Sequence, residues 1–287
     1  IFNFSFNLQS VPLSIIGVSY ASAVFPALAR LFSSGNREKF IEQMIVSARH
    51  IIFLSTPLMV LFVVLRAQIV RVILGAGNFN WSDTRLTAAA LAIFSISVVP
   101  QGLLQLFVRA YYSKGDTKKP LIINLISSTL IVILGYVFIT TFNNFPTFRY
   151  FIEELFKVSN LSGSVVLMLP LAYSIGVLVN TAFHWLAFHK EFKNFTKSIS
   201  SAIYQSFSAS IIMGYVTYIF LNVFDKVFDI NTLVGIFSQG LFAGLIGVAV
   251  GIFILKLLKS HELSEIWKTL HAKIWKAKVI APEQEML

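Results

Sequence analysis

The residues with the most chemistry to offer lie in the segment RAYYSKGDTKKP, between Arg109 and Pro120, directly after an uncharged run at 86–108. A run of this length crosses the hydrocarbon core of a membrane as a helix, and a basic hairpin at its exit is typical of the cytoplasmic side. Asp116 can pair with Arg109 across the turn at Gly115. We therefore predict a cytoplasmic hinge, formed by Gly115, Asp116, Thr117 and Pro120.

Other residue types that perform chemistry are few in this sequence. The chain has no cysteine, which removes disulfides, thiolate metal sites and thiol nucleophiles together. It has no glycine-rich phosphate-binding loop, no His–Glu–x–x–His pattern, and no pair of carboxylates within an apolar run. His184 and His189 have no nearby carboxylate or third histidine that would complete a metal site. We therefore expect a protein that is not an enzyme and that needs no cofactor or metal.

The composition is that of a membrane protein. Hydrophobic residues make up 56% of the chain and charged residues 13%, and phenylalanine occurs 28 times, with a mean hydropathy of +0.76. Apolar runs of spanning length recur and are separated by charged connections. They lie at about 11–33, 44–65, 86–108, 121–142, 161–187, 198–224 and 230–255. The sequence therefore predicts an all-α integral membrane protein, with about seven transmembrane helices in a lobe at 1–258.

The lysines and arginines are distributed unevenly over the two sides of this arrangement. Seventeen of the 23 lie in alternate connections on one side, and such an excess marks cytoplasmic connections. We therefore expect a cytoplasmic C-terminus and, after seven spans, an external N-terminus. The net charge of +10 suits anionic membrane lipids as partners, so we expect no nucleic acid. An external start at Ile1, without a signal-peptide pattern, leads us to expect a further N-terminal part.

Two segments outside the spans have helical patterns. The connection at 140–161 can form a short surface helix. The segment at 259–287 is a basic, amphipathic tail, with its apolar residues on one helical face and its lysines largely elsewhere. The apolar set is Leu263, Ile266, Trp267, Leu270, Ile274 and Trp275, and the basic set is Lys268, Lys273, Lys276 and Lys278. Such a segment lies among lipid headgroups as an anchor, which we favour, or binds a partner.

Three stretches resemble one known family. They read VPLSIIGVSYASAVFPALARL at 11–31, GNFNWSDTRLTAAALAIFSISVVPQGLLQLFVRAYYSKGDTKKP at 77–120 and LAYSIGVLVNTAF at 171–183. The second is similar to a hairpin of the pattern Arg–Ala–Phe–Tyr–Ala–x–x–Asp–Thr–x–x–Pro, and the third to a Leu–Ala–Thr–Ser–Ile–x–x–x–Val–Asn run. Together they resemble the MurJ/MviN family, which belongs to the multidrug/oligosaccharidyl-lipid/polysaccharide exporter superfamily.

The resemblance implies a flippase for lipid II, the undecaprenyl-diphosphate-linked glycan lipid of cell-wall synthesis, in the bacterial plasma membrane. In the implied mechanism, two helical lobes rock around a cationic cavity while the lipid tail stays in a groove beside the last two spans. By order, the seven spans correspond to the second half of a fourteen-helix transporter, with the N-terminal half of the same protein as the partner lobe. Two alternatives stay open, namely an exporter of another polyprenyl-linked glycan or small molecule, and a non-transporting membrane scaffold of cell-wall synthesis.

A substrate that carries a diphosphate requires guanidinium or ammonium groups that face a cavity. Arg30 and Arg109, at the ends of the first and third spans, are the candidates, although side chains at helix ends also reach lipid headgroups. The family's cavity arginine corresponds to Asn7 in this chain. Asn7 and Gln9 can hydrogen-bond a sugar or a phosphate but contribute no charge.

The resemblance also bears on cation binding. Some members bind sodium through an Asn on the fourth of these spans, and that position is Gly135 in this chain. Asn124 lies in the same span nearer its cytoplasmic end, and Asn180 on the next span is the remaining candidate for a cation ligand. We therefore assign no cation site, and the membrane potential is an alternative driving force for transport.

Overall fold

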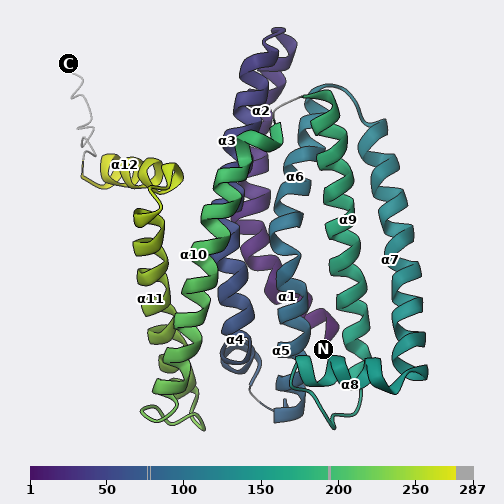
Figure 1. Ribbon diagram of the computed structural model, residues 1–287, viewed down its shortest axis with the longest axis vertical. Helices are drawn as coiled ribbons and strands as arrows, with labels where there is room; N and C mark the ends of the chain where they lie inside the picture. The colour runs from purple at the N-terminus through teal and green to yellow at the C-terminus, as the bar shows by residue number, and fades with distance from the viewer. Residues whose placement is uncertain (76, 78, 193–194, 276–287) are drawn as a thin grey trace, which may run out of the picture.

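The computed structural model describes residues 1–75, 77, 79–192 and 195–275, and side chains through residue 269. Lys193, Lys276 and Lys278, which were counted above, lie outside the described residues, as do the side chains of Leu270, Lys273, Ile274 and Trp275. The described part is helical and has no strand. Its α-helices, shown in Figure 1, are α1 (Phe2–Pro12), α2 (Ser19–Ser33), α3 (Arg37–Val64), α4 (Arg66–Leu74), α5 (Trp81–Ile96), α6 (Val98–Ser113), α7 (Lys118–Asn144), α8 (Pro146–Leu155), α9 (Met168–Glu191), α10 (Phe195–Phe224), α11 (Leu233–Leu257) and α12 (His261–Trp275).

Six segments of the described chain are long and apolar enough to cross a membrane, and α5 with α6 makes a seventh if the bent pair is one span. This agrees with the all-α membrane class predicted from the sequence. The first segment runs from Phe2 to Ser33, because a π-helical turn at Leu13–Val18 joins α1 to α2. It therefore starts before the run expected at 11–33 and includes Asn7 and Gln9.

The span expected at 86–108 is broken in the structure. α5 and α6 meet at Ser97 with a bend of 41°. Pro100 has no N–H to donate to the carbonyl of Ile96, one helical turn earlier, so the helix ends there. Ser97 closes the break, since its hydroxyl donates to the carbonyl of Phe94 at 2.6 Å and is buried.

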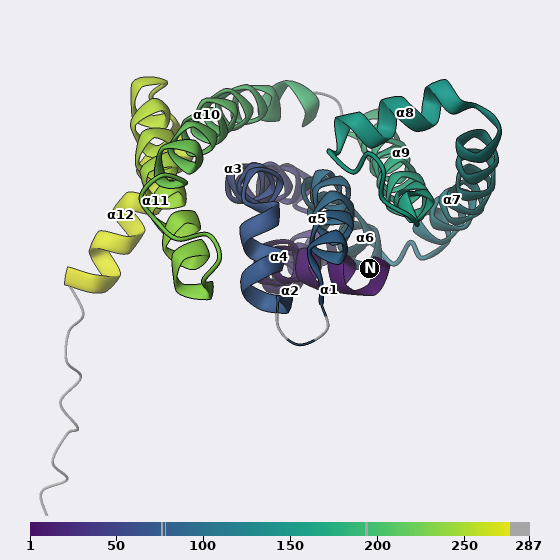
Figure 2. The same cartoon turned by 90° about the horizontal axis from the view of Figure 1, so that it is seen from below.

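The helices form three groups when the bundle is viewed end-on. Figure 2 shows α1 to α6 in the middle, α7 to α9 on one side and α10 to α12 on the other. An aromatic cluster joins the groups, with Phe107 of α6 at 5.5 Å from Phe188 of α9, and Phe188 at 4.9 Å from Phe195 of α10, measured between ring centroids. These rings are fully buried, and such pairs add about 0.5–1.5 kcal/mol each beyond the area they bury.

The connections gather at the two ends of the bundle. Those from α2 to α3, from α6 to α7 and from α11 to α12 lie toward one end, and α4 and α8 lie toward the other (Figure 1). Many of the basic residues counted in the sequence lie in the first set or in the helix turns that adjoin it. The short surface helix expected at 140–161 is confirmed as α8, which starts with Pro146 at its first position.

The basic tail begins with α12, which lies across the end of α11 (Figure 1). Leu263 and Ile266 of the predicted apolar face pack against a small core cluster that includes Phe53 of α3, whereas Trp267 is exposed. The sequence did not indicate the ion pair that holds this helix: Glu262 accepts a hydrogen bond from Nε of Arg49 on α3 at 2.6 Å. The described part of the tail, α12, is therefore docked on the bundle.

Candidate functional site

The predicted hinge is a tight hairpin between α6 and α7. Gly115 has φ of +75°, a conformation that favours glycine, and the Asp116 carboxylate accepts a hydrogen bond from the backbone N–H of Lys119 at 3.1 Å. That bond satisfies one of the amides that the first turn of α7 leaves free. Thr117 precedes α7 and Pro120 is buried in its first turn.

The ion pairs of the hairpin differ from the pair expected between Asp116 and Arg109. Asp116 pairs with Lys119 at 3.6 Å, because its place before the first turn of α7 aims the carboxylate at that helix. Lys114 pairs closely with Glu191 at the end of α9, and Lys119 lies 3.5 Å from the same carboxylate. Ion pairs therefore connect the hinge to α9, and the prediction of an ion pair between Arg109 and Asp116 is wrong.

Arg109 instead lines a cavity of about 300 Å³ on the surface of α2 and α6. The other lining residues are Phe25, Gln105, Val108 and Tyr112. No carboxylate in the described chain forms an ion pair with Arg109. A guanidinium beside an amide and a phenol can bind a phosphate or another anion. Arg30, in the last turn of α2, is exposed and is not among the residues that line this cavity.

Asn7 and Gln9 lie on α1 in different environments. Asn7 is exposed. Gln9 is fully buried, and its side-chain oxygen accepts a hydrogen bond from Nε2 of Gln101 at 3.2 Å. The oxygen of Gln101 accepts a hydrogen bond from the Tyr173 hydroxyl, also at 3.2 Å. Gln9 therefore belongs to a polar network that links α1, α6 and α9.

The structure brings the two asparagines considered for cation binding together. Nδ2 of Asn180 on α9 donates to Oδ1 of Asn124 on α7 at 3.0 Å. Gly135, the position implied by the resemblance, faces Leu169 and Ala172 and offers no side-chain ligand. No group of three or more histidine or carboxylate side chains suited to a metal occurs in the described chain.

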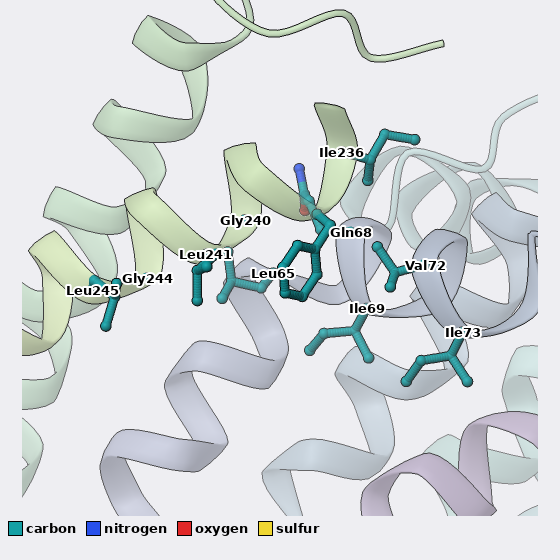
Figure 3. Close-up of a pocket in the computed structure, with 11 residues that line it drawn as sticks. Leu65, Gln68, Ile69, Val72, Ile73, Ile236, Gly240, Leu241, Gly244 and Leu245 are labelled. Atoms are coloured by element: carbon teal, nitrogen blue, oxygen red, sulfur yellow. The ribbon is translucent and has the colours of Figure 1, made fainter. Parts of the chain in front are cut away.

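An apolar groove opens between α4 and α11. Figure 3 shows its walls, which converge from the two helices on a cavity of about 430 Å³. Gln68 is the one polar side chain in the lining; the others are Leu65, Ile69, Val72, Ile73, Ile236, Phe237, Gly240, Leu241, Gly244 and Leu245. A Cβ on Gly240 would lie 3.2 Å from Cβ of Gln68, and a Cβ on Gly244 would lie 3.3 Å from Leu65. The two glycines therefore allow α11 to approach α4 this closely.

One wall of the groove was missed in the sequence. The segment of α4 was treated as part of an external connection because it contains Arg66 and Arg71. The signal was present, since Leu65, Ile69 and Ile73 recur every four residues and form one apolar helical face. The glycines of α11 are apparent in the sequence, but only the fold shows that two of them face α4.

Comparison with known proteins identifies the family of this chain. A family model described as "Lipid II flippase MurJ" matches residues 1–238. The chain belongs to the MurJ family. Similar MurJ-family proteins include a "Probable lipid II flippase MurJ" of Bdellovibrio bacteriovorus, 32% identical over 131 residues, and one of Thermotoga maritima, 25% identical over 266 residues. The matches cover 46% and 91% of this chain, but 25% and 46% of those proteins.

A solved MurJ structure shares the fold. The chain described as "Lipid II flippase MurJ, inward closed conformation" superposes with a TM-score of 0.59 at 18% sequence identity. The match covers 94% of this chain and 47% of that chain. This MurJ-family chain therefore spans about half the length of the solved relative that it matches.

Proposed function

We propose that the chain is one lobe of a lipid II flippase in the bacterial plasma membrane. The match of the MurJ family model to residues 1–238 is the observation that carries this proposal. The N-terminal half of the same protein supplies the other lobe, the C-terminus is cytoplasmic, and the two lobes alternate in access. The uneven distribution of basic residues supports this orientation.

The groove between α4 and α11 is suited to the polyprenyl tail. Its lining is almost entirely apolar (Figure 3), and it lies at the end of the bundle where α4 lies (Figure 1). Lipid chains and a polyprenyl chain are similarly apolar, so the groove contributes little affinity over the surrounding membrane. Its role is to hold the tail in place while the headgroup moves between the lobes.

The cavity at Arg109 is suited to the anionic part of the headgroup. Arg109 lacks an ion-pair partner in the described chain, and Gln105 and Tyr112 beside it add hydrogen-bonding groups. Arg30 supplies a second guanidinium on the adjacent helix α2, and exposed Asn7 supplies an uncharged contact. Gln9 acts by holding α1 to α6, and the hinge at Gly115 lets these helices move against α7.

Complementation tests the function. The complete protein is expressed in cells depleted of their own lipid II flippase, and survival is scored. We expect rescue by the wild type, loss of rescue with Arg109→Gln and a weaker defect with Arg30→Ala. Leu241→Trp, which fills the groove, should impair rescue, whereas Leu257→Trp, exposed on the same helix outside the groove, should not.

The outcomes of the complementation experiment distinguish lipid II transport from the two alternative functions. A wild-type protein that inserts into the membrane but does not rescue would exclude lipid II transport in those cells. It would favour an exporter of another polyprenyl-linked glycan or a non-transporting scaffold. Equal rescue by the two tryptophan variants would show that the groove does not hold the tail.

A further inference from the structure

A second cavity, here named the Arg66 cavity, lies between α10 and the junction of α3 with α4. Its volume is about 600 Å³, and α11 closes it on one side with Gln239. Gln68 lines both this cavity and the apolar groove, so the two are neighbours. Arg66 and Asp225 are the charged residues in its lining. The Arg66 cavity therefore presents charges of both signs, whereas the groove presents none.

The lining changes from apolar to polar along the cavity. At one end α10 touches α3, because Val60 leaves no room for a Cβ on Gly214. At the other end, Asn222 in the last turn of α10 and Asp225 just after it line the cavity together with Arg66, the first residue of α4. α4 and the last turn of α10 lie toward the same end of the bundle (Figure 1). This gradient matches a phospholipid, whose charged head lies at the membrane surface and whose chains lie deeper.

Arg66 supplies a cation that has no anionic partner. Its side chain is partly buried, and Nη1 donates to the backbone carbonyl oxygen of Val63 at 3.3 Å. The ion pairs found among the described residues do not include Arg66. Most of its five N–H donors are therefore available, and a guanidinium in this state suits a phosphate.

Asp225 supplies an anion at the same end of the cavity. It is exposed, and its carboxylate forms no ion pair with any residue that the structure describes, Arg66 included. A ligand that is only anionic would gain from Arg66 but would be repelled by Asp225. A ligand that carries a phosphate and an ammonium complements both.

Amide side chains add acceptors near the two charges. Nε2 of Gln68 donates to Oε1 of Gln239 at 3.3 Å, and Nε2 of Gln239 donates to the carbonyl oxygen of Leu221 at 3.0 Å. Oε1 of Gln68 is buried and has no donor among the described residues. Nδ2 of Asn222 donates to the carbonyl oxygen of Tyr218, which leaves Oδ1 of Asn222 as an acceptor. A primary ammonium has three N–H donors for such oxygens, whereas a quaternary ammonium has none.

We propose that the Arg66 cavity binds one zwitterionic phospholipid with a primary ammonium, namely phosphatidylethanolamine. The phosphate lies against Arg66, the ammonium lies against Asp225, and an acyl chain follows α10 toward Gly214. The lipid fills the space between α10 and the end of α3, next to the groove. This site does not depend on which substrate the protein carries, so a failure of lipid II transport would leave the proposal standing.

Native mass spectrometry of the complete protein in detergent micelles tests the proposal. Phosphatidylethanolamine, phosphatidylcholine and phosphatidylglycerol with identical acyl chains are titrated separately. Phosphatidylcholine has the same phosphate but no N–H donor, and phosphatidylglycerol has no ammonium. We expect one phosphatidylethanolamine to bind about threefold or more tightly than either of the others. Free phosphoethanolamine, which has the head but no chains, should not displace it at an equal concentration.

Two charge substitutions and two matched controls locate the site. Arg66→Gln should weaken the binding of phosphatidylethanolamine about tenfold, since it removes a charged hydrogen-bond donor. Asp225→Asn should remove the preference over phosphatidylcholine. Arg71→Gln, on the same helix but outside the lining, should leave the binding unchanged. So should Asp229→Asn, which lies outside the lining and keeps an acceptor for the backbone N–H of Asn231.

A third pair of variants tests the place of the acyl chain. Ile211→Trp fills the apolar part of the cavity and should weaken the binding, whereas Ile212→Trp, exposed on α10 outside the lining, should not. Thermal unfolding shows that each variant is folded. Equal affinities of the wild type for phosphatidylethanolamine and phosphatidylcholine would overturn the proposal, and so would equal behaviour of Asp225→Asn and Asp229→Asn. Displacement by free phosphoethanolamine would assign the cavity to a soluble zwitterion instead.

Discussion

Replacing Glu262 with Gln should weaken the docking of α12 on α3 by about 1–3 kcal/mol. The Glu262 side chain is 2% exposed and Arg49 is 27% exposed, so the pair is intermediate between two known cases. Exposed ion pairs contribute about 0–1 kcal/mol, and breaking a fully buried pair costs about 3–5 kcal/mol. Gln keeps the shape of the side chain and removes its charge. The expected change corresponds to an about 5- to 150-fold shift toward undocked α12.

The docking should also depend on pH. Burial alone would raise the pKa of Glu262, but hydrogen bonds from its own backbone N–H, from Arg49 and from Ser260 outweigh burial and lower that pKa below its ordinary value of 4.5. The carboxylate therefore stabilises docked α12 fully above about pH 4.5, the value expected when α12 is undocked. This stabilisation should be lost as the pH falls through the lower pKa of the docked state.

Hydrogen exchange of the α12 amides measures the docking. We expect exchange at neutral pH to be about 5- to 150-fold faster with Glu262→Gln than in the wild type. The control is Glu265→Gln, because Glu265 is 45% exposed and its partners are His50 and His261 rather than an arginine. Equal exchange rates in the two variants would refute the assignment of Arg49–Glu262 as the contact that holds α12.

Two further substitutions test the hinge and the polar network. Asp116→Ala removes the acceptor for an amide in the first turn of α7 and should cost about 0.5–2 kcal/mol, seen as faster exchange of that turn, whereas Asp116→Asn should retain most of the protection. Gln101→Leu leaves Gln9 and Tyr173 without their partner and should lower the free energy of unfolding by about 1–3 kcal/mol. The control Gln105→Leu, at the Arg109 cavity, should have a smaller effect on thermal unfolding.

Hydropathy was enough to predict the class of fold and the approximate positions of the long apolar helices. A run such as 121–142 is apolar because its side chains face lipid or other helices, and this signal is local. The break at Ser97 was only partly readable. Pro100 is a typical cause of a kink in a helix. The 41° bend lies three residues before it, at Ser97, because the carbonyl that loses its donor is that of Ile96.

The sites were harder to predict because they depend on contacts between distant segments. Gln9 meets Gln101 across 92 residues, and Arg49 meets Glu262 across 213. Spacing along one helix cannot reveal such pairs. His184 shows the same limit, since nothing in its local sequence indicates that the packing of the helices buries it fully.

The connection between α3 and α4 has a mechanical consequence. Leu65 alone separates the two helices, and its N–H bonds back to Leu61 while its carbonyl accepts from Ile69. α3 is a long helix in the middle of the bundle, and α4 is a short helix that follows its end without a flexible linker. A small tilt of α3 therefore swings α4 toward or away from α11, as a lever does. The width of the groove is thus set by the orientation of α3.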